Sequence, residues 1–241
     1  MTTHLPSVTP LQQLVDDVLI DVDASNNPYF RHLVDGSFSR EDFLETQRQF
    51  HAAVVFFHRP MAALAAKIPD PALRLEILRN VWEENGEGDI SKAHGATFVT
   101  FLSRLQGCSE ATVRAELEAC PLWPEVRAFN TVLVGACVVD DPLVGAGTMG
   151  IIERMFSEIS SWIGRACVAR GFIAEGDMIH YDLHEHLDVR HATDFFRVLG
   201  ASWDAGPAAR ADIEQGLRMG ALVFDQLYAR LYRARQRRWR R

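Results

Sequence analysis

Cysteine is scarce in this sequence of 241 residues, and the four cysteines stand far apart. No two of them form a CxxC pair, on which many structural zinc sites depend, and their spacing does not suggest a disulfide framework. We therefore expect neither a zinc knuckle nor disulfides, and we expect the thiols to be reduced and mostly buried. The four residues are Cys108, Cys120, Cys137 and Cys167.

Long apolar runs are also missing. No stretch reaches the roughly 18 uncharged residues that a membrane-spanning helix requires. The opening residues, MTTHLPSVTP, lack the basic and apolar regions of a signal peptide. These absences predict a cytoplasmic protein with no membrane partner.

Positive charge is in deficit over most of the chain. There are 25 Lys and Arg against 32 Asp and Glu, which gives a formal net charge of −7. Because nucleic-acid phosphates attract basic proteins, this balance predicts no nucleic-acid partner. The segment 230–241 departs from the rest because it holds seven arginines. We interpret it as a solvated helix end or a frayed basic tail, with a nucleic-acid or membrane patch as the alternative.

Alternating strand patterns are absent too, and helical patterns take their place. Apolar residues recur at steps of three and four, as in Leu11, Leu14 and Val15, which is the period of an amphipathic helix. Ser39 suits the N-cap of a helix that ends near Lys67. Further helices are predicted over residues 71–84, 89–106, 109–119, 123–137, 141–170, 174–200 and 205–237. We therefore predict an all-α protein with a single domain.

The most specific pattern for chemistry is His184-x3-Asp188-x2-His191. Steps of four and three residues bring all three side chains onto one face of a helix, where they form a ready set of metal ligands. The alternative is a polar helix face whose histidines meet solvent. His180, one turn earlier, is interpreted as a solvent-facing histidine, with support of a metal ligand as its alternative.

Two further features add candidate ligands. Glu83, Glu84 and Glu87 precede His94, and Glu153 is a charged residue within the largely apolar stretch GAGTMGIIERMF. Burying a carboxylate is unfavourable unless something pairs with it, and a metal cation is a strong partner. Three imidazoles and three carboxylates from several helices suit a pair of iron ions better than a structural zinc.

Together these motifs resemble those of the haem-oxygenase-like di-iron oxidases and oxygenases, which are related to the quinone-biosynthesis oxidase and to thiaminase-type bundles. The resemblance covers roughly residues 28–199. It rests on an Asn-x3-Glu with a following Gly and His, a lone Glu, and a final His-x3-Asp-x2-His. It implies one haem-oxygenase-like helical bundle over residues 1–241. It also implies six iron ligands and no catalytic residues beyond them: Glu84, His94, Glu153, His184, Asp188 and His191.

One of these ligands is open to alternatives. The step of seven positions from Glu87 to His94 suits an unbroken helix better than the step of ten from Glu84 to His94. Gly86 and Gly88 are expected to interrupt the helix, however, so ideal helical angles need not apply. We favour Glu84, then Glu87, then Glu83.

The resemblance also implies an activity. Two iron ions would activate dioxygen, the co-substrate, to oxidise a small amino-acid-like or aliphatic molecule, with electrons from an external reductant or a donor protein. Some relatives that oxidise nitrogen carry an extra carboxylate on the helix that corresponds to residues 39–67. Residues 50–66 hold none, which favours desaturation, C–C cleavage or decarboxylation. A homodimer is possible.

Two other functions compete with this one. A metal-free hydrolase of the thiaminase type would need a cysteine nucleophile, for which Cys137 or Cys108 is the first candidate. The bundle would otherwise serve as a binding protein whose arginine-rich end meets an acidic partner.

Overall fold

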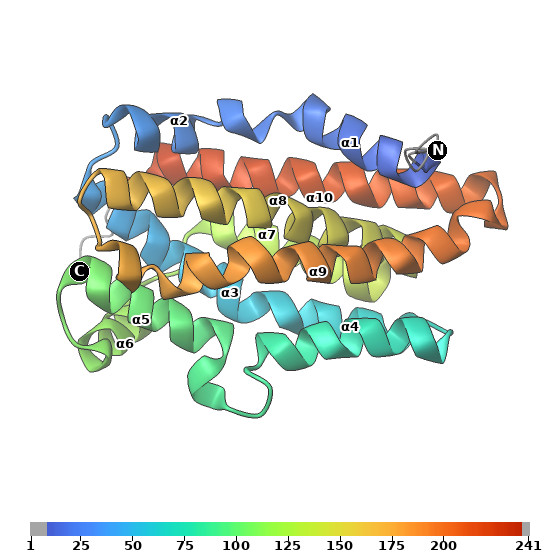
Figure 1. Ribbon diagram of the computed structural model, residues 1–241, viewed down its shortest axis with the longest axis horizontal. Coiled ribbons are helices and arrows are strands. Elements are labelled where there is room, and N and C mark those ends of the chain that lie inside the picture. Colours follow the sequence, from blue (N-terminus) through green and yellow to red (C-terminus); the bar gives the residue numbers. More distant parts are fainter. Residues whose placement is uncertain (1–8, 238–241) are drawn as a thin grey trace, which may run out of the picture.

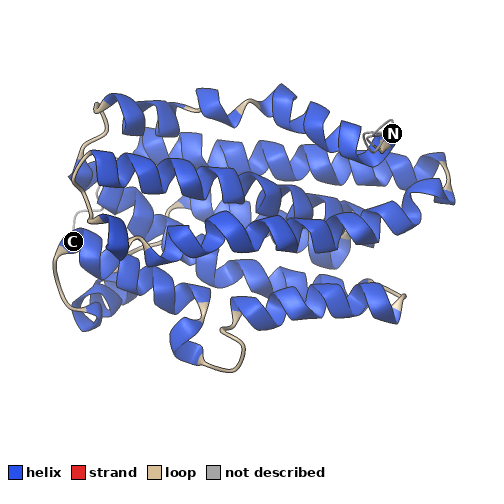
Figure 2. Cartoon of the chain, viewed as in Figure 1, coloured by secondary structure: helices blue, strands red, loops and turns tan. Residues whose placement is uncertain are grey.

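A computed structural model describes residues 9–237, apart from the side chains of Ile179, Leu183, Glu185 and His186. All regular secondary structure in these residues is helical (Figure 2), so the prediction of an all-α protein is confirmed. The α-helices are α1 (Pro10–Val22), α2 (Pro28–Asp35), α3 (Arg40–Lys67), α4 (Pro71–Glu84), α5 (His94–Gln106), α6 (Glu110–Ala119), α7 (Pro124–Val134), α8 (Pro142–Ala169), α9 (Ile179–Ser202) and α10 (Pro207–Ala234).

Local sequence signals set where the helices begin. Helices α1, α2, α4 and α8 each start with a proline, whose missing N–H is harmless in the first turn. The residue before each proline caps the helix, because its side chain accepts a hydrogen bond from a free backbone N–H. Ser39 caps α3 as predicted, with the Asp42 N–H donating to its hydroxyl at 3.1 Å.

The long helices run side by side and form the centre of the molecule (Figure 1). Helix α8 packs along both α9 and α10, and α3 contacts α4, α5 and α7. Helices α1 and α2 lie against α10, while α4 and α5 lie against α9 (Figure 1). The buried apolar core fills the space between these helices.

Helices α8 and α10 approach each other closely where both lack bulky side chains. A Cβ atom added at Gly216 would lie 2.4 Å from the carbonyl oxygen of Val144. One added at Gly220 would lie 2.5 Å from the carbonyl oxygen of Thr148. Glycine at these positions lets the two backbones touch, which fixes the depth of α8 in the bundle.

Several helix boundaries differ from those predicted. Helix α5 begins at His94 rather than at residue 89, because residues 86–88 all adopt positive φ angles that end α4. Helix α9 begins at Ile179 rather than at residue 174, after a short 3-10 turn. Helix α2 was not predicted, since eight residues are too few for a clear helical period.

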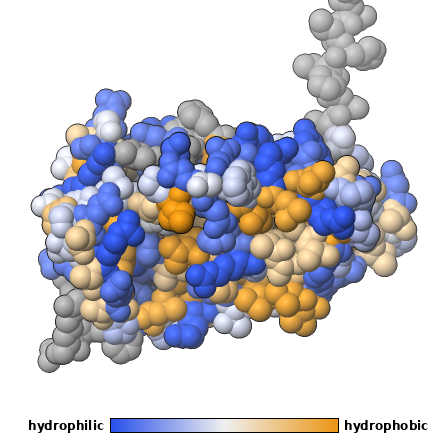
Figure 3. Space-filling model, turned by 90° about the horizontal axis from the view of Figure 1, so that it is seen from below, coloured by the Kyte–Doolittle hydropathy of each residue, from blue (hydrophilic) through white to orange (hydrophobic). Residues whose placement is uncertain are grey.

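Helix α4 turns polar residues inward. Its buried side chains include Asn80, Glu83 and Glu84. Large apolar side chains on the same helix are exposed: Leu75, Leu78 and Trp82. The molecule seen from below, the side on which α4 lies, accordingly mixes hydrophobic and hydrophilic patches (Figure 3). Such an inverted helix indicates that its inner face meets something other than an apolar core.

No single helix between residues 9 and 237 is long and apolar enough to cross a membrane. One sharply bent pair, Glu110–Ala119 with Pro124–Val139, meets that standard only when its two parts are taken together.

Part of the arginine-rich end folds onto the bundle. Arg237 forms two short contacts with the Glu125 carboxylate, at 2.7 and 2.9 Å, and lies over the ring of Trp123. Arg235 lies over the ring of Tyr232. The last three arginines, at 238, 240 and 241, lie outside the described residues.

The close approach of α8 and α10 predicts the effect of a single methyl group. Gly216→Ala should lower the free energy of unfolding by about 1–3 kcal/mol, because the added Cβ must push the two helices apart. Chemical denaturation measures the change. Gly135→Ala is the matched control, since a Cβ there would meet no atom within 4 Å. Equal stability of the two variants would contradict this description of the helix contact.

Candidate metal centre

The six predicted ligands come together in one buried cluster. Glu84 is the last residue of α4 and His94 the first of α5, while Glu153 lies in the middle of α8. The other three project from one face of α9. Each of the six side chains belongs to a residue no more than 4% exposed: Glu84, His94, Glu153, His184, Asp188 and His191.

The loop between α4 and α5 explains how Glu84 and His94 meet. A Cβ at Gly86 would lie 2.2 Å from the carbonyl oxygen of Asp89, so only glycine fits at this reversal of the chain. The reversal brings His94 Nδ1 to 2.7 Å from Glu84 Oε2. Glu87, the first alternative to Glu84, is exposed within the same loop.

One ring nitrogen of His191 has a hydrogen-bond partner, and the other has none. Its Nε2–H donates to Glu83 at 2.8 Å, which leaves Nδ1 as the ring atom that can bind a metal. That Nδ1 faces carboxylate oxygens of Glu153, Glu84 and Asp188 at 3.6, 3.7 and 3.9 Å. These distances are too long for hydrogen bonds but leave a space between the atoms. Ligand atoms of Glu84, Glu153 and His191 all lie within 4.8 Å of one another, as metal ligands do.

Unpaired polar atoms gather in this cluster. A buried polar atom without a hydrogen bond is unfavourable, and few are expected in a folded protein. Among the described residues, four such atoms belong to the predicted ligands: Glu153 Oε1, His184 Nε2, Asp188 Oδ2 and His191 Nδ1. Nitrogen lone pairs and carboxylate oxygens are donors that iron accepts, so the residues fit bound iron.

Hydrogen bonds within α9 prepare another ligand atom. The Nδ1–H of His184 donates to Asp188 Oδ1 at 2.8 Å, which leaves the lone pair of the ring on Nε2. That Nε2 is buried and has no partner. The arrangement matches the way a carboxylate commonly orients a metal-binding histidine.

The acid–base properties of the cluster are strongly perturbed. Burial raises the pKa of Glu153 to about 7, and the charge of Asp188 adds to this effect. Burial opposes charge on Glu84 as well, but the nearby His94 outweighs it and lowers the pKa of Glu84 to about 2. Burial disfavours a charged His191, yet Glu153 and the other carboxylates raise its pKa to about 10. Buried groups with such opposed pKa shifts are typical of functional sites.

Glu83 supports the cluster from outside it. Besides accepting from His191, its carboxylate accepts from Arg190 at 2.5 Å and lies 4.0 Å from Arg79. The sequence analysis ranked Glu83 only as a third possible ligand and did not assign it this role. The sequence did hold a signal for this role. Glu83 and Glu84 are adjacent at the end of α4, and neighbouring residues of a helix cannot both face the same ion directly, so only one of the two suits a metal ligand.

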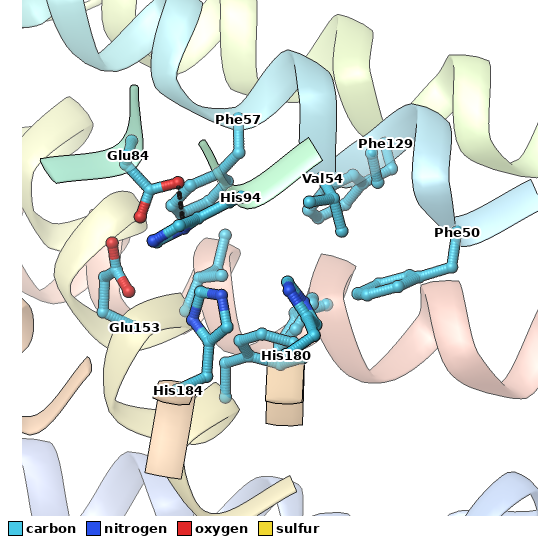
Figure 4. A pocket seen from close by; sticks show the side chains of 13 residues that line it. Phe50, Val54, Phe57, Glu84, His94, Phe129, Glu153, His180 and His184 are labelled. Atoms are coloured by element: carbon cyan, nitrogen blue, oxygen red, sulfur yellow. Dashed lines mark ion pairs between the residues drawn. The ribbon is translucent and has the colours of Figure 1, made fainter. Parts of the chain in front are cut away.

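A cavity opens beside the cluster. Glu84, His94, Glu153 and His184 lie at one end of it, and His180 lies further along, near Val54 and Phe50 (Figure 4). Its remaining wall is apolar and comes from α3, α7, α8 and α10: Phe50, Ala53, Val54, Phe57, Phe129, Ile152, Phe156 and Phe224. The cavity is narrow, with a volume of about 40 Å³.

His180 is fully buried, so its interpretation as a solvent-facing histidine is wrong. Burial among aromatic rings lowers the pKa of His180 well below its usual value, and the ring is therefore neutral. The error has a simple cause. Helical spacing shows that His180 and His184 share a face, but not how far along the helix that face is covered.

The cysteines do not support a nucleophile in this cavity. Burial raises the pKa of Cys137 and of Cys167 to about 12, so both thiols stay protonated near neutral pH. Cys108 and Cys120 are partly exposed, and the four residues form no disulfide. None of the four is among the residues that line the cavity.

A family model described as iron-containing redox enzyme matches residues 44–225, well over half of the chain. The chain belongs to this family. The resemblance stated from the motifs is thus confirmed, and the matched region holds all six predicted ligands. No curated protein matches the chain.

Solved structures similar to this family member share its fold. A domain of unknown function with a heme oxygenase-like fold from Shewanella denitrificans is 14% identical, with a TM-score of 0.76 and 95% of each chain covered. A TenA homologue from Pseudomonas syringae pv. tomato is 15% identical, with a TM-score of 0.75 and 96% of each chain covered. A CADD-like protein of unknown function from Nostoc punctiforme is 13% identical, with a TM-score of 0.71, covering 92% of this chain and 96% of that one. The predicted haem-oxygenase-like bundle is confirmed.

The contact between Glu83 and His191 predicts a graded loss of metal affinity. Glu83→Ala should weaken Fe(II) binding by about 10- to 100-fold, because His191 loses the acceptor that orients its ring. Anaerobic competition against a chromophoric chelator measures the affinity, and circular dichroism checks the fold. Glu87→Ala, an exposed neighbour, is the control and should bind like the unaltered protein. If all three proteins bind Fe(II) equally, Glu83 has no orienting role.

Proposed function

We propose that this protein is a non-haem di-iron oxidase or oxygenase that uses dioxygen to oxidise a small organic substrate. One observation carries the proposal. Four unpaired, buried atoms of metal-binding type, drawn from α8 and α9, lie beside an apolar cavity, next to the paired Glu84 and His94. Membership in the family of iron-containing redox enzymes supports iron as the metal.

The size of the ligand set favours two ions. Three imidazoles and three carboxylates exceed the four ligands of a typical single structural site. Inward-facing glutamates and histidines on several helices are the way in which bundle proteins hold iron pairs. The negative charges of Glu84, Glu153 and Asp188 would nearly balance two divalent cations, which makes the burial of all these charges acceptable.

The chain's own residues would prepare the site for oxidation. Iron bound here supplies the electron-transfer chemistry that activates dioxygen. Glu83 holds the ring of His191 in place, and Asp188 does the same for His184. The phenylalanines of the cavity wall exclude water, which protects a reactive oxidant from side reactions.

The cavity wall supports oxidation at carbon. Helix α3 contributes Phe50, Ala53, Val54 and Phe57 to the wall, and residues 50–66 include no carboxylate. By the family resemblance this favours desaturation, C–C cleavage or decarboxylation of an amino-acid-like or aliphatic substrate over oxygenation of nitrogen. An external reductant or donor protein would supply the electrons.

Iron stoichiometry and oxygen consumption test the proposal together. Protein loaded anaerobically with Fe(II) and desalted should retain about two irons per chain and consume oxygen on exposure to air. His191→Ala should retain less iron and lose the oxygen consumption, whereas His32→Ala, on α2, should behave like the unaltered protein. Full iron retention by the His191 variant would remove this residue from the site. Retention of no iron by the unaltered protein would refute the proposal.

A further inference from the structure

His180 is a buried polar residue in the cavity to which the proposed iron chemistry assigns no role. It lies in the first turn of α9, is fully buried, and lines the cavity beside the metal cluster. Its Nε2 atom is buried and has no hydrogen-bond partner. Figure 4 shows His180 on the far side of His184 from Glu84 and Glu153, next to the apolar part of the wall.

Hydrogen bonds on the other edge of the ring fix which nitrogen carries the proton. The hydroxyl of Thr97 donates its single hydrogen to the carbonyl oxygen of His94 at 3.0 Å. The same hydroxyl oxygen lies 3.1 Å from His180 Nδ1, and with its hydrogen on His94 it accepts from the Nδ1–H, an assignment that the ring's ¹⁵N shifts test. The neutral ring therefore carries its lone pair on Nε2, and Nε2 is a hydrogen-bond acceptor.

Aromatic neighbours keep this acceptor in place. The ring of His180 packs edge to face against Phe98, at 4.7 Å between centroids, and against Tyr181, at 5.3 Å. A histidine held on two sides by rings and on a third by Thr97 is not free to turn its unpaired nitrogen toward another protein group. The ring of His184, 4.3 Å away between centroids, supplies no hydrogen either, because its N–H is engaged with Asp188. A partner for His180 Nε2 therefore comes from what enters the cavity.

The rest of the cavity restricts what that partner is. Among the described residues that line it, the charged groups belong to the metal cluster, and the remaining wall is apolar apart from His180. An additional charge on a molecule held against this wall would be buried without a counter-charge. A hydrogen-bond donor at His180 would instead be paired.

We propose that His180 Nε2 accepts a hydrogen bond from a hydroxyl or N–H group of the substrate, and that the substrate is otherwise an apolar molecule. The term substrate rests on the proposed oxidase function. The hydrogen bond itself requires no iron, so binding to His180 is testable separately.

Two pairs of matched probes test the role of His180. Indole and benzothiophene have nearly the same shape, as do pyrrole and thiophene, but only the first member of each pair carries an N–H. Dissociation constants are measured by ligand-observed NMR and calorimetry for iron-loaded and for iron-free protein. The unaltered protein should bind the N–H member of a pair about tenfold more tightly than its sulfur analogue.

Two variants and a control identify the residue responsible. His180→Ala leaves more space, so the sulfur probes should still bind, while the preference for N–H should disappear. His180→Gln places an amide oxygen near the former Nε2 and should restore part of the preference. His51→Ala removes another largely buried histidine that also contacts Phe98 but does not line the cavity, and should keep the full preference.

The possible outcomes separate this inference from the proposed function. Three results would overturn the inference about His180. The unaltered protein binds both members of each pair equally, it binds none of the probes at millimolar concentration, or the preference for N–H survives His180→Ala. Loss of iron from His180→Ala would also overturn it, since His180 would then be a metal ligand. If the unaltered protein holds no iron but prefers indole, the oxidase proposal fails and the role of His180 stands.

The tautomer provides a second, independent readout. The ¹⁵N chemical shifts of the His180 ring in iron-free protein should identify a protonated Nδ1 and an unprotonated Nε2. Thr97→Val removes the acceptor for Nδ1–H and should reduce the preference for indole. A ring protonated on Nε2 would contradict the inference, because that atom would then be a donor.

Discussion

Buried charge is the constraint on which the rest of this structure depends. Three carboxylates and three imidazoles lie inside an apolar helical bundle, where a charge is strongly disfavoured unless an opposite charge lies close by. Protein groups satisfy part of this requirement, through Glu83, Arg190 and the contact between His94 and Glu84. The atoms that remain unpaired all belong to the types that bind metal cations, and they face one another. Cations bound here, as proposed, would give these residues the partners that the chain does not provide.

The fold is arranged around that requirement. Glycines shape this arrangement at two places: the reversal at Gly86, and the close approach of α8 to α10 at Gly216 and Gly220. Helix α9 provides three of the proposed ligands on one face and, one turn earlier, a neutral histidine that lines the cavity. The same helix thus connects the metal cluster to the space in which a substrate would lie. Helix α4 turns acids inward and leaves three of its large apolar residues, Leu75, Leu78 and Trp82, at the surface.

Much of this was predictable from the sequence, because the strongest signals are local. The cap at Ser39 predicted the start of α3, and the spacing of His184, Asp188 and His191 placed them on one face. The roles of Glu83 and His180 were not predictable in the same way. Glu83 acts through a contact with His191, which is 108 residues away in sequence. His180 depends on burial by α5 and α8, and a helical period carries no information about neighbouring helices.

The most direct test of this account is anomalous diffraction at the iron absorption edge from crystals of protein loaded anaerobically with Fe(II). The account predicts two anomalous peaks, both among the side chains of Glu84, His94, Glu153, His184, Asp188 and His191. Crystals that contain iron but show no peak among these residues would contradict it.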